Sequence, residues 1–401
     1  MGRFRKEVLS SVDHIPFRRA FFFLCIIGLL SYFCYNLVRT PVLPLFAQEL
    51  GALPQLIGVI VATSTITGIF VKLPSGIAAD IVGRRAVSLT GVMIFSLMPF
   101  AYVFVQHIWL LIVIRSIHGL ATALFAPVAM AIVADLYPSN RGEYLGWYSS
   151  STQIGKLLGP MAGGYLLGRT GFSNTFKVCG LIGLIPLSLA ISVPVGKERR
   201  HEPMAFQRMI LKFREELKGV SRDRRILVTS AMEGVQMLAG GALMAFLPLY
   251  GTQVGLSAAQ VGLLFGVQGV AALVAKPLMG RLSDQMGRRP LIIVGLVGCA
   301  LTFAMIPLVS DFPVLLLIAT GFGLAEAIVT SSTAALVADL CQTQSLGSAM
   351  GVFGTIMDIG HASGPILAGL LISAFGYPVA FSLISLILLA GTTIFTKAVR
   401  Q

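Results

Sequence analysis

The chain has 401 residues, of which 56% are hydrophobic and only 12% are charged. A soluble domain carries about twice that charged fraction. The apolar residues occur in runs of roughly 20, each long enough to cross a hydrocarbon core of about 30 Å. A soluble protein could not bury so much apolar surface, so the composition excludes a soluble domain and indicates an integral membrane protein.

Twelve apolar runs predict an all-α membrane protein with twelve transmembrane helices. The breaks between runs place these helices at residues 20–47, 56–79, 86–105, 109–135, 143–168, 174–195, 226–251, 260–283, 290–309, 314–339, 348–374 and 379–396. The first run follows a basic stretch, but it is too long for the core of a signal peptide and lacks a small-residue cleavage site.

The net charge of +13 is distributed unevenly across the predicted membrane. Most of the 30 Lys and Arg residues lie in the tails and in the loops on one side, whereas the opposite loops hold only Arg169 and Lys177. The positive-inside rule then places both termini and the segment 196–225 in the cytoplasm of a multi-pass plasma (inner) membrane protein. This distribution argues against a nucleic-acid partner and for contact with anionic lipid head groups.

A ten-residue phrase occurs twice in the chain. Residues 76–85 (GIAADIVGRR) return as residues 280–289 (GRLSDQMGRR), and neighbouring positions such as Lys72 and Lys276 match in the same register. Six spans per half predict two pseudo-symmetric six-helix bundles, residues 1–195 and 226–401, related by an axis along the membrane normal. The linker 196–225 is predicted to hold a basic amphipathic helix on the inner leaflet, with a partly ordered tether as the alternative.

The repeated phrase resembles the signature loop of the major facilitator superfamily. The matching positions are Gly76, Asp80, Gly83, Arg84 and Arg85, with Gly280, Asp284, Gly287, Arg288 and Arg289 in the second copy. Residues 115–119 (RSIHG) resemble the Arg-x-x-Gln-Gly motif of proton-coupled members, with His118 in place of the usual Gln. Residues 155–164 (GKLLGPMAGG), in the fifth predicted span, resemble the motif associated with the drug:proton antiporters.

The loop phrase suits a tight turn at the membrane surface. Gly83 and Gly287 permit positive φ angles, and the arginines anchor the loop at the head groups. The resemblance implies that Asp80 and Asp284 contact a positive helix N-terminus of the other half and so form a cytoplasmic gate. Further candidates for this charge cluster are Asp135 and Asp339, with Arg141 and Glu143. The alternative is a topology anchor without a gating role.

The span-five motif has a counterpart in span eleven. The shared small residues and prolines are Gly155, Gly159, Pro160, Gly163 and Gly164, with Gly360, Gly364 and Pro365 in the second half. Small residues allow helices to approach closely, and Pro bends a helix where a neighbour can satisfy the freed carbonyl. Close packing near the pseudo-axis and an antiport role are equally compatible with this pattern.

Ionisable residues inside the spans are expensive and usually functional. The candidates for proton coupling are Arg115, Glu233, Glu326, Asp358 and His361. The candidates for the substrate cavity are Asn36, Arg39, His118, Glu233 and Glu326. Asp358 and His361 are three residues apart on one helical face, so they are a candidate proton relay, with a satisfied core histidine as the alternative. Lys72 and Lys276 are expected to snorkel toward the inner interface, and Arg39 toward the outer one.

The leading hypothesis is a proton-coupled exporter of small amphipathic organic compounds. A proton-coupled importer of an organic anion or metabolite and a lipid or lysolipid flippase are the alternatives. The sequence has no phosphate loop, no Cys/His cluster and no Ser/His/Asp arrangement, which argues against an ATP-driven pump, a metal site or an enzyme. We expect a monomer that takes small-molecule substrates and protons, with the proton gradient in place of a cofactor.

Overall fold

The computed structural model describes residues 2–192, 223–341 and 346–399, and these are almost entirely helical. The first half consists of α1 (Gly2–Leu37), a π-helical segment η1 (Val38–Val42), α2 (Leu43–Glu49), α3 (Pro54–Val82), α4 (Arg84–Tyr102), α5 (Ile108–Leu136) and α6 (Arg141–Ser192). The second half consists of α8 (Arg224–Gln253), α9 (Ala258–Met286), α10 (Arg288–Met305), a 3₁₀ turn η2 (Ile306–Leu308), α11 (Phe312–Leu340) and α12 (Leu346–Ala398). Most of the predicted linker helix, and the side chain of Asp80, lie outside the described part of the structure.

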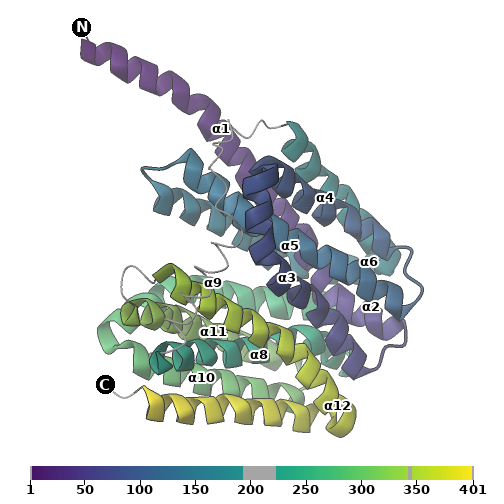
Figure 1. Cartoon of the computed structure of the whole chain (residues 1–401). Coiled ribbons are helices and arrows are strands. Elements are labelled where there is room, and N and C mark those ends of the chain that lie inside the picture. The colour runs from purple at the N-terminus through teal and green to yellow at the C-terminus, as the bar shows by residue number, and fades with distance from the viewer. Residues whose placement is uncertain (1, 193–222, 342–345, 400–401) are drawn as a thin grey trace.

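Ten helices in the described residues are long and apolar enough to cross a membrane. Two of them, α6 with 52 residues and α12 with 53, are much longer than one crossing requires. A straight helix of that length would measure about 78 Å. Each is broken by a glycine with positive φ, Gly171 in α6 and Gly376 in α12. Figure 1 shows α12 turning back on itself. The twelve predicted spans therefore correspond to ten assigned helices, two of which contain two predicted spans each.

The first predicted span is interrupted where the sequence places a proline. Thr40 adopts an extended conformation (φ −149°, ψ 126°) within η1. Pro41 follows it and has no backbone N–H to donate, so the regular helical hydrogen-bond pattern cannot continue through this point. This break divides the predicted span into α1, η1 and α2, and Arg39 lies on η1, the irregular stretch between the two helices.

The two repeated loops form one-residue turns. Gly83 separates α3 from α4 with φ 108° and ψ 138°, and Gly287 separates α9 from α10 with φ 92° and ψ 146°. Residues with a Cβ atom rarely adopt this region. The prediction of a positive-φ glycine in both loops is confirmed. Below, the end of the molecule that carries these two glycines is called the motif end, and the other is called the opposite end.

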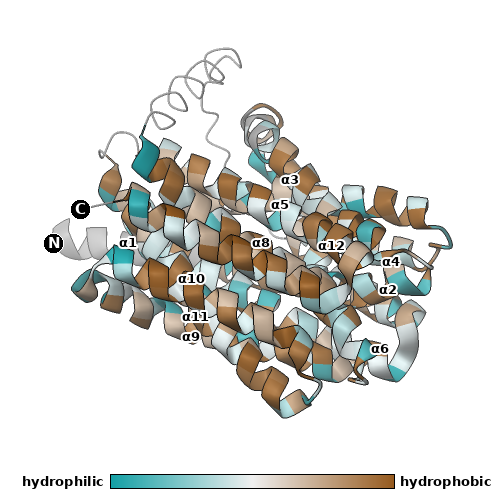
Figure 2. Cartoon of the chain, turned by 90° about the horizontal axis from the view of Figure 1, so that it is seen from below, coloured by the Kyte–Doolittle hydropathy of each residue, from teal (hydrophilic) through white to brown (hydrophobic). Residues whose placement is uncertain are grey.

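The outer surface of the bundles is apolar. Phe70, Trp109 and Leu317 are each more than 70% exposed. Figure 2 shows apolar residues along the middle of the helices and hydrophilic residues gathered mainly near their ends. Water would make such a continuous apolar surface costly, whereas lipid matches it. The structure therefore supports an integral membrane protein.

The halves form two bundles that meet along two helix pairs, α3 with α12 and α6 with α9. We call these pairs the α3/α12 seam and the α6/α9 seam. In Figure 1 the bundles diverge toward the end where both termini lie, which is the motif end. Glycines permit the closest contacts near the opposite end. A Cβ atom at Gly58 would lie 2.1 Å from the Pro365 carbonyl oxygen, and one at Gly164 would lie 2.3 Å from that of Ala258.

Candidate functional site

Ion pairs tie the first arginine of each repeated loop to its own half. Arg84 binds the carboxylate of Asp135 at the end of α5. Arg288 binds Asp284 on α9 and donates from Nε to Oδ2 of Asp339 on α11, at 3.0 Å. The same contact therefore joins α4 with α5 and α10 with α11, so Asp135 and Asp339 occupy equivalent places in the two halves.

The second arginine of each loop reaches the last helix of its half. Arg85 donates to the carbonyl oxygen of Ile191 at 3.1 Å, and Arg289 donates to that of Thr396. These bonds connect the start of α4 with the end of α6, and the start of α10 with the end of α12. In this conformation the described carboxylates of the motif pair within their halves, and Asp284 forms no ion pair with the described residues of the first half. Arg141, a predicted cluster member, instead donates to the Ala134 carbonyl oxygen.

The glycine-proline motifs pack both against a helix of their own half and against the other half. Gly155, Gly159 and Gly163 face α1 and η1, where added Cβ atoms would lie 2.2–2.8 Å from the carbonyl oxygens of residues 29, 33 and 37. Gly360 and Gly364 meet α8 in the same way, at 2.0 Å from the carbonyl oxygens of residues 234 and 238. The neighbouring Pro160, Gly164 and Pro365 touch the other half. Close packing thus accounts for the positions of these residues.

Arg115 on α5 is completely buried and lacks a carboxylate partner among the described residues. Its guanidinium donates to Ser64 Oγ on α3 at 2.7 Å and lies 5.3 Å from the centre of the Tyr35 ring. Nε and Nη1 have no hydrogen-bond partner in the described part of the chain. Burying a charged arginine inside a membrane span costs free energy, and charged residues there usually have a function. Arg115 therefore remains a candidate functional residue.

His118 lies one turn from Arg115 and is also fully buried. Its Nδ1 lies 3.1 Å from the Tyr102 hydroxyl, and its ring packs edge-on against Tyr35. Enclosed in this way, His118 does not line open space in this conformation, although the sequence suggested a cavity position. Asn36, another cavity candidate, is half-buried and donates to the Tyr32 carbonyl oxygen of its own helix.

Among the described residues, two polar contacts cross from the first half to α12, one from α3 and one from η1. Lys72 forms an ion pair with Asp358, and Arg39 Nη2 lies 2.8 Å from His361 Nε2. Helical side chains tilt toward the helix N-terminus, which for α3 is the opposite end. Lys72 therefore extends toward Asp358 rather than toward the motif end, so the snorkelling interpretation is wrong for this lysine. Arg39 points inward to His361 and Thr65 rather than outward.

The proposed relay between Asp358 and His361 has no direct bond in this structure. Both residues lie on α12, as the three-residue spacing predicts, but each bonds to a basic residue of the first half. Because an arginine only donates hydrogen bonds, Nε2 of His361 accepts from Arg39. A relay through the two side chains would require a rearrangement of these contacts.

Two carboxylates inside the predicted spans of the second half, Glu233 and Glu326, have no cation at ion-pair distance among the described residues. Glu233 on α8 is completely buried, and its Oε2 accepts a hydrogen bond from Thr333 Oγ1 of α11 at 2.7 Å. Glu326 on α11 is half-buried, and its Oε2 accepts from Gln268 Nε2 of α9 at 3.2 Å. Neutral donors on neighbouring helices thus hold both groups.

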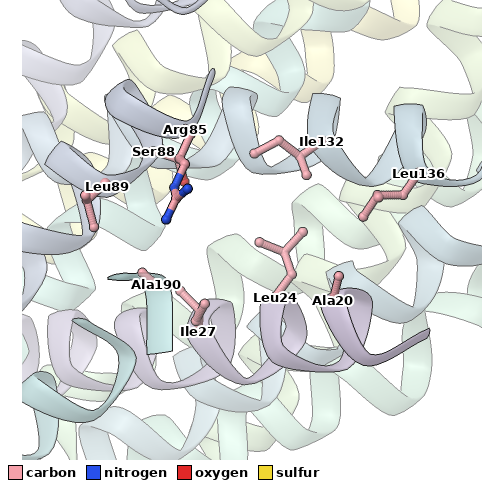
Figure 3. A pocket seen from close by; sticks show the side chains of 9 residues that line it. All are labelled: Ala20, Leu24, Ile27, Arg85, Ser88, Leu89, Ile132, Leu136 and Ala190. Carbon is pink, nitrogen blue, oxygen red and sulfur yellow. The ribbon is translucent and has the colours of Figure 1, made fainter. Parts of the chain in front are cut away.

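A separate pocket lies within the first half near the motif end. It encloses about 520 Å³ of empty space, part of it open, between α1, α4, α5 and α6. Figure 3 shows Leu24 and Ile132 facing this space from opposite sides, with Arg85 at its edge. None of its lining residues belongs to the second half, so it is distinct from the charged groups between the halves.

Sequence reasoning missed the neutral partners of the charged groups. Ser64, Thr333 and Gln268 each bond to a predicted site residue, and Tyr35 packs against both Arg39 and Arg115. Polar residues inside apolar spans were the available signal. A single hydroxyl or amide is common in an apolar span, so it does not mark a site in the sequence. Only the tertiary packing shows which charged group it contacts.

A duplicated helical membrane bundle with ionisable groups between its halves has the architecture of a secondary transporter. The chain belongs to the major facilitator superfamily, whose family model matches residues 24–235 and again residues 229–400. Its members are transporters, so this chain is a transporter rather than an enzyme.

Individual relatives share about a quarter of their residues with this chain. It is 24% identical to an uncharacterized MFS-type transporter of Methanocaldococcus jannaschii, over 84% of this chain and 87% of that protein. It is 27% identical to the multidrug resistance protein MdtG of Escherichia fergusonii, over 85% of both chains.

Solved structures support the fold. A bacterial homolog of the human lysosomal transporter Spinster, in an inward-facing and unoccupied conformation, matches with a TM-score of 0.78 and 16% identity over 96% of this chain and 95% of that one. The nucleoside transporter NupG matches with a TM-score of 0.77 and 14% identity over 94% of this chain and 98% of that one. At these identities the likeness concerns the fold.

Proposed function

We propose that this transporter exports small amphipathic organic compounds in exchange for protons, by alternating access. The observation that carries the proposal is the pair of second-half carboxylates, Glu233 and Glu326, which are held by neutral donors. An ionised carboxylate is costly to bury without a cation, and protonation removes that cost. The relationship to multidrug resistance proteins supports the direction and the substrate class.

The seams suggest how the carboxylates are coupled to the conformation. The charge distribution favours a cytoplasmic location for the motif end. The halves pack most closely at the opposite end, so this conformation faces inward on that orientation. A proton that enters from outside neutralises Glu326 or Glu233 and favours the inward-facing state, in which the carboxylate releases the proton to the inside and substrate binds. Release of substrate outside leaves the carboxylate free to accept the next proton. The coupling requires only that protonation stabilises one state more than the other.

Everted membrane vesicles test the coupling directly. Addition of a substrate should dissipate an imposed proton gradient, and Glu326→Gln should abolish gradient-driven transport because the amide cannot take up a proton. Asp311→Asn is the matched control, since Asp311 is a carboxylate at the exposed start of the same helix. An unchanged rate in Glu326→Gln would remove this residue from the mechanism. A lack of proton movement with any transported compound would refute antiport.

A second candidate, proton-coupled import of an organic anion, is favoured by the basic residues. Arg39, Lys72 and Lys276 act electrostatically on Lys156, and they come from both halves. The direction of flux in intact cells separates the two functions. Expression of an exporter lowers the accumulation of a labelled substrate, and expression of an importer raises it.

A further inference from the structure

The α6/α9 seam brings two lysines from different halves toward each other. Cβ atoms at Gly266 and Gly269 of α9 would contact Met161 and Leu157 of α6 at 2.5 Å and 2.6 Å. Lys156 is the residue next to Leu157. Lys276 lies seven residues beyond Gly269, and therefore on the same face of α9.

The directions of the two helices aim these side chains at one another. Helical side chains tilt toward the helix N-terminus. The N-terminus of α6 lies at the motif end and that of α9 lies at the opposite end. Lys156 therefore extends toward the motif end, Lys276 toward the opposite end, and each approaches the level of the other. Lys276 is among the charged groups that act on Lys156.

Neither lysine has a carboxylate at ion-pair distance among the residues that the structure describes. Lys156 is exposed, and its Nζ lies 4.7 Å from the centre of the Tyr32 ring on α1. The equivalent place in the α3/α12 seam is different, because there Asp358 pairs with Lys72. The position in α6 that corresponds to Asp358 is Gln153, so the carboxylate is missing from this seam.

Lys156 directly precedes Leu157, which packs on Gly269 of the second half, and charged groups of both halves act on it. We therefore place its exposed side toward the space between the halves rather than toward lipid. Two ammonium groups that approach each other repel, and an anion between them removes the repulsion. Lysine ammonium groups bind carboxylate and phosphate as point charges. The Tyr32 ring holds Lys156 by a cation–π contact and so reduces the freedom that binding would otherwise remove.

We propose that Lys156 and Lys276 form a two-lysine site for the anionic group, a carboxylate or a phosphate, of the amphipathic compound that is transported. This site rests on the proposed transport function, and it narrows the substrate class to organic anions. An exporter and an importer would both use it, because it concerns recognition and not direction.

A matched set of ligands tests the site at equilibrium, without a gradient. Phenylbutanoate, phenylbutyl phosphate, phenylbutanol and phenylbutylamine share one apolar group and differ in charge. They are titrated by calorimetry into the purified full chain in an uncharged detergent. We expect the two anions to bind at least about tenfold more tightly than the alcohol and the amine, and salt to weaken only the anions. Weak or equal binding of the anions and the alcohol would overturn the proposal.

Variants then separate a ligand site from a structural role. Lys156→Gln and Lys276→Gln should each weaken the anions about tenfold and leave the alcohol unchanged. Lys177→Gln removes the same charge from an exposed position of α6 beyond the break at Gly171 and should change neither. If the two variants weaken the alcohol as much as the anions, the lysines have a structural role and do not bind the anionic group. A preference for the amine in Lys156→Glu/Lys276→Glu confirms contact even if a single variant folds poorly.

Separate titrations distinguish the sources of the anionic group. Inorganic phosphate tests a site for the bare ion, and phosphatidylglycerol in nanodiscs tests a site for a lipid head group. Tighter binding of either than of the phenylbutyl anions would overturn the assignment to a small amphipathic compound. The outcome is independent of proton coupling. Lysine-dependent binding with no proton movement in vesicles would keep the site and reject the antiport.

Discussion

The two seams between the halves are built alike and charged differently. Both close near the opposite end through glycines that touch the backbone of the other half, at Gly58 and Gly369 in the α3/α12 seam and at Gly164 and Gly262 in the α6/α9 seam. The α3/α12 seam also contains the Lys72–Asp358 ion pair. Its counterpart contains two lysines without a carboxylate among the described residues. The two seams therefore share their packing but differ in their charged residues. We assign the shared packing to the scaffold and the differing charges to substrate and proton binding.

The largest effect is expected where the seams share their packing. Gly58→Ala places a Cβ atom 2.1 Å from a backbone oxygen of α12, which cannot move aside as a flexible side chain could. We expect it to destabilise this conformation by about 1–3 kcal/mol and to lower the thermal unfolding midpoint. The same holds for Gly164→Ala at the α6/α9 seam.

Controls for these substitutions lie on the same helices. A Cβ atom at Gly68 of α3 or at Gly146 of α6 meets nothing within 4 Å. Gly68→Ala and Gly146→Ala should therefore be neutral or slightly stabilising, since alanine favours a helix more than glycine does. If Gly58→Ala is as stable as Gly68→Ala, then the seam is not closed by glycine contact.

A smaller effect is expected when one seam is made to resemble the other. Gln153→Asp supplies the α6/α9 seam with the carboxylate that the α3/α12 seam has at Asp358. The new group should pair with Lys276 and weaken the phenylbutyl anions about fivefold, or ~1 kcal/mol. Asp358→Asn should not weaken them, because it frees Lys72 of its counter-ion. Unchanged anion binding in Gln153→Asp would show that the two lysines do not define the difference between the seams.

Much of the scaffold was predictable from the sequence, because its signals are local. Runs of apolar residues, the loop phrase and the positive-φ glycines each follow from adjacent residues, and the duplication follows from their spacing. The break at Thr40 was missed although Pro41 marks it, because an apolar run was treated as one helix.

The partners of the charges could not be predicted in the same way. Asp358 and His361 do share a helical face, as their spacing requires. However, α12 packs against α3 and His361 meets Arg39 of η1, and these contacts decide what the two residues bond. Lys72 pairs with Asp358 across most of the length of the sequence. Symmetry indicated which charged residues differ between the halves; it could not indicate that Asp358 and His361 would each meet a basic residue of the other half.

The smallest effect is expected at the motif end, where the halves are again alike. Asp135 and Asp339 pair with the first loop arginine, and exposed pairs contribute about 1 kcal/mol or less. Asp339→Asn should cost less stability than Asp135→Asn, because Arg288 keeps its pair with Asp284. Salt should reduce both effects, and thermal unfolding at two salt concentrations measures them.

Transport measurements on the same variants decide between a gate and an anchor. A carboxylate that only anchors its loop changes transport in proportion to stability, since it acts equally in every state. A gate contact is made in one state alone, so its removal shifts the balance between states and alters the rate at unchanged stability. Asp284→Asn is the informative variant, because Asp284 pairs within its own half in this conformation. If its transport rate equals that of Asp339→Asn at equal stability, the gate interpretation fails.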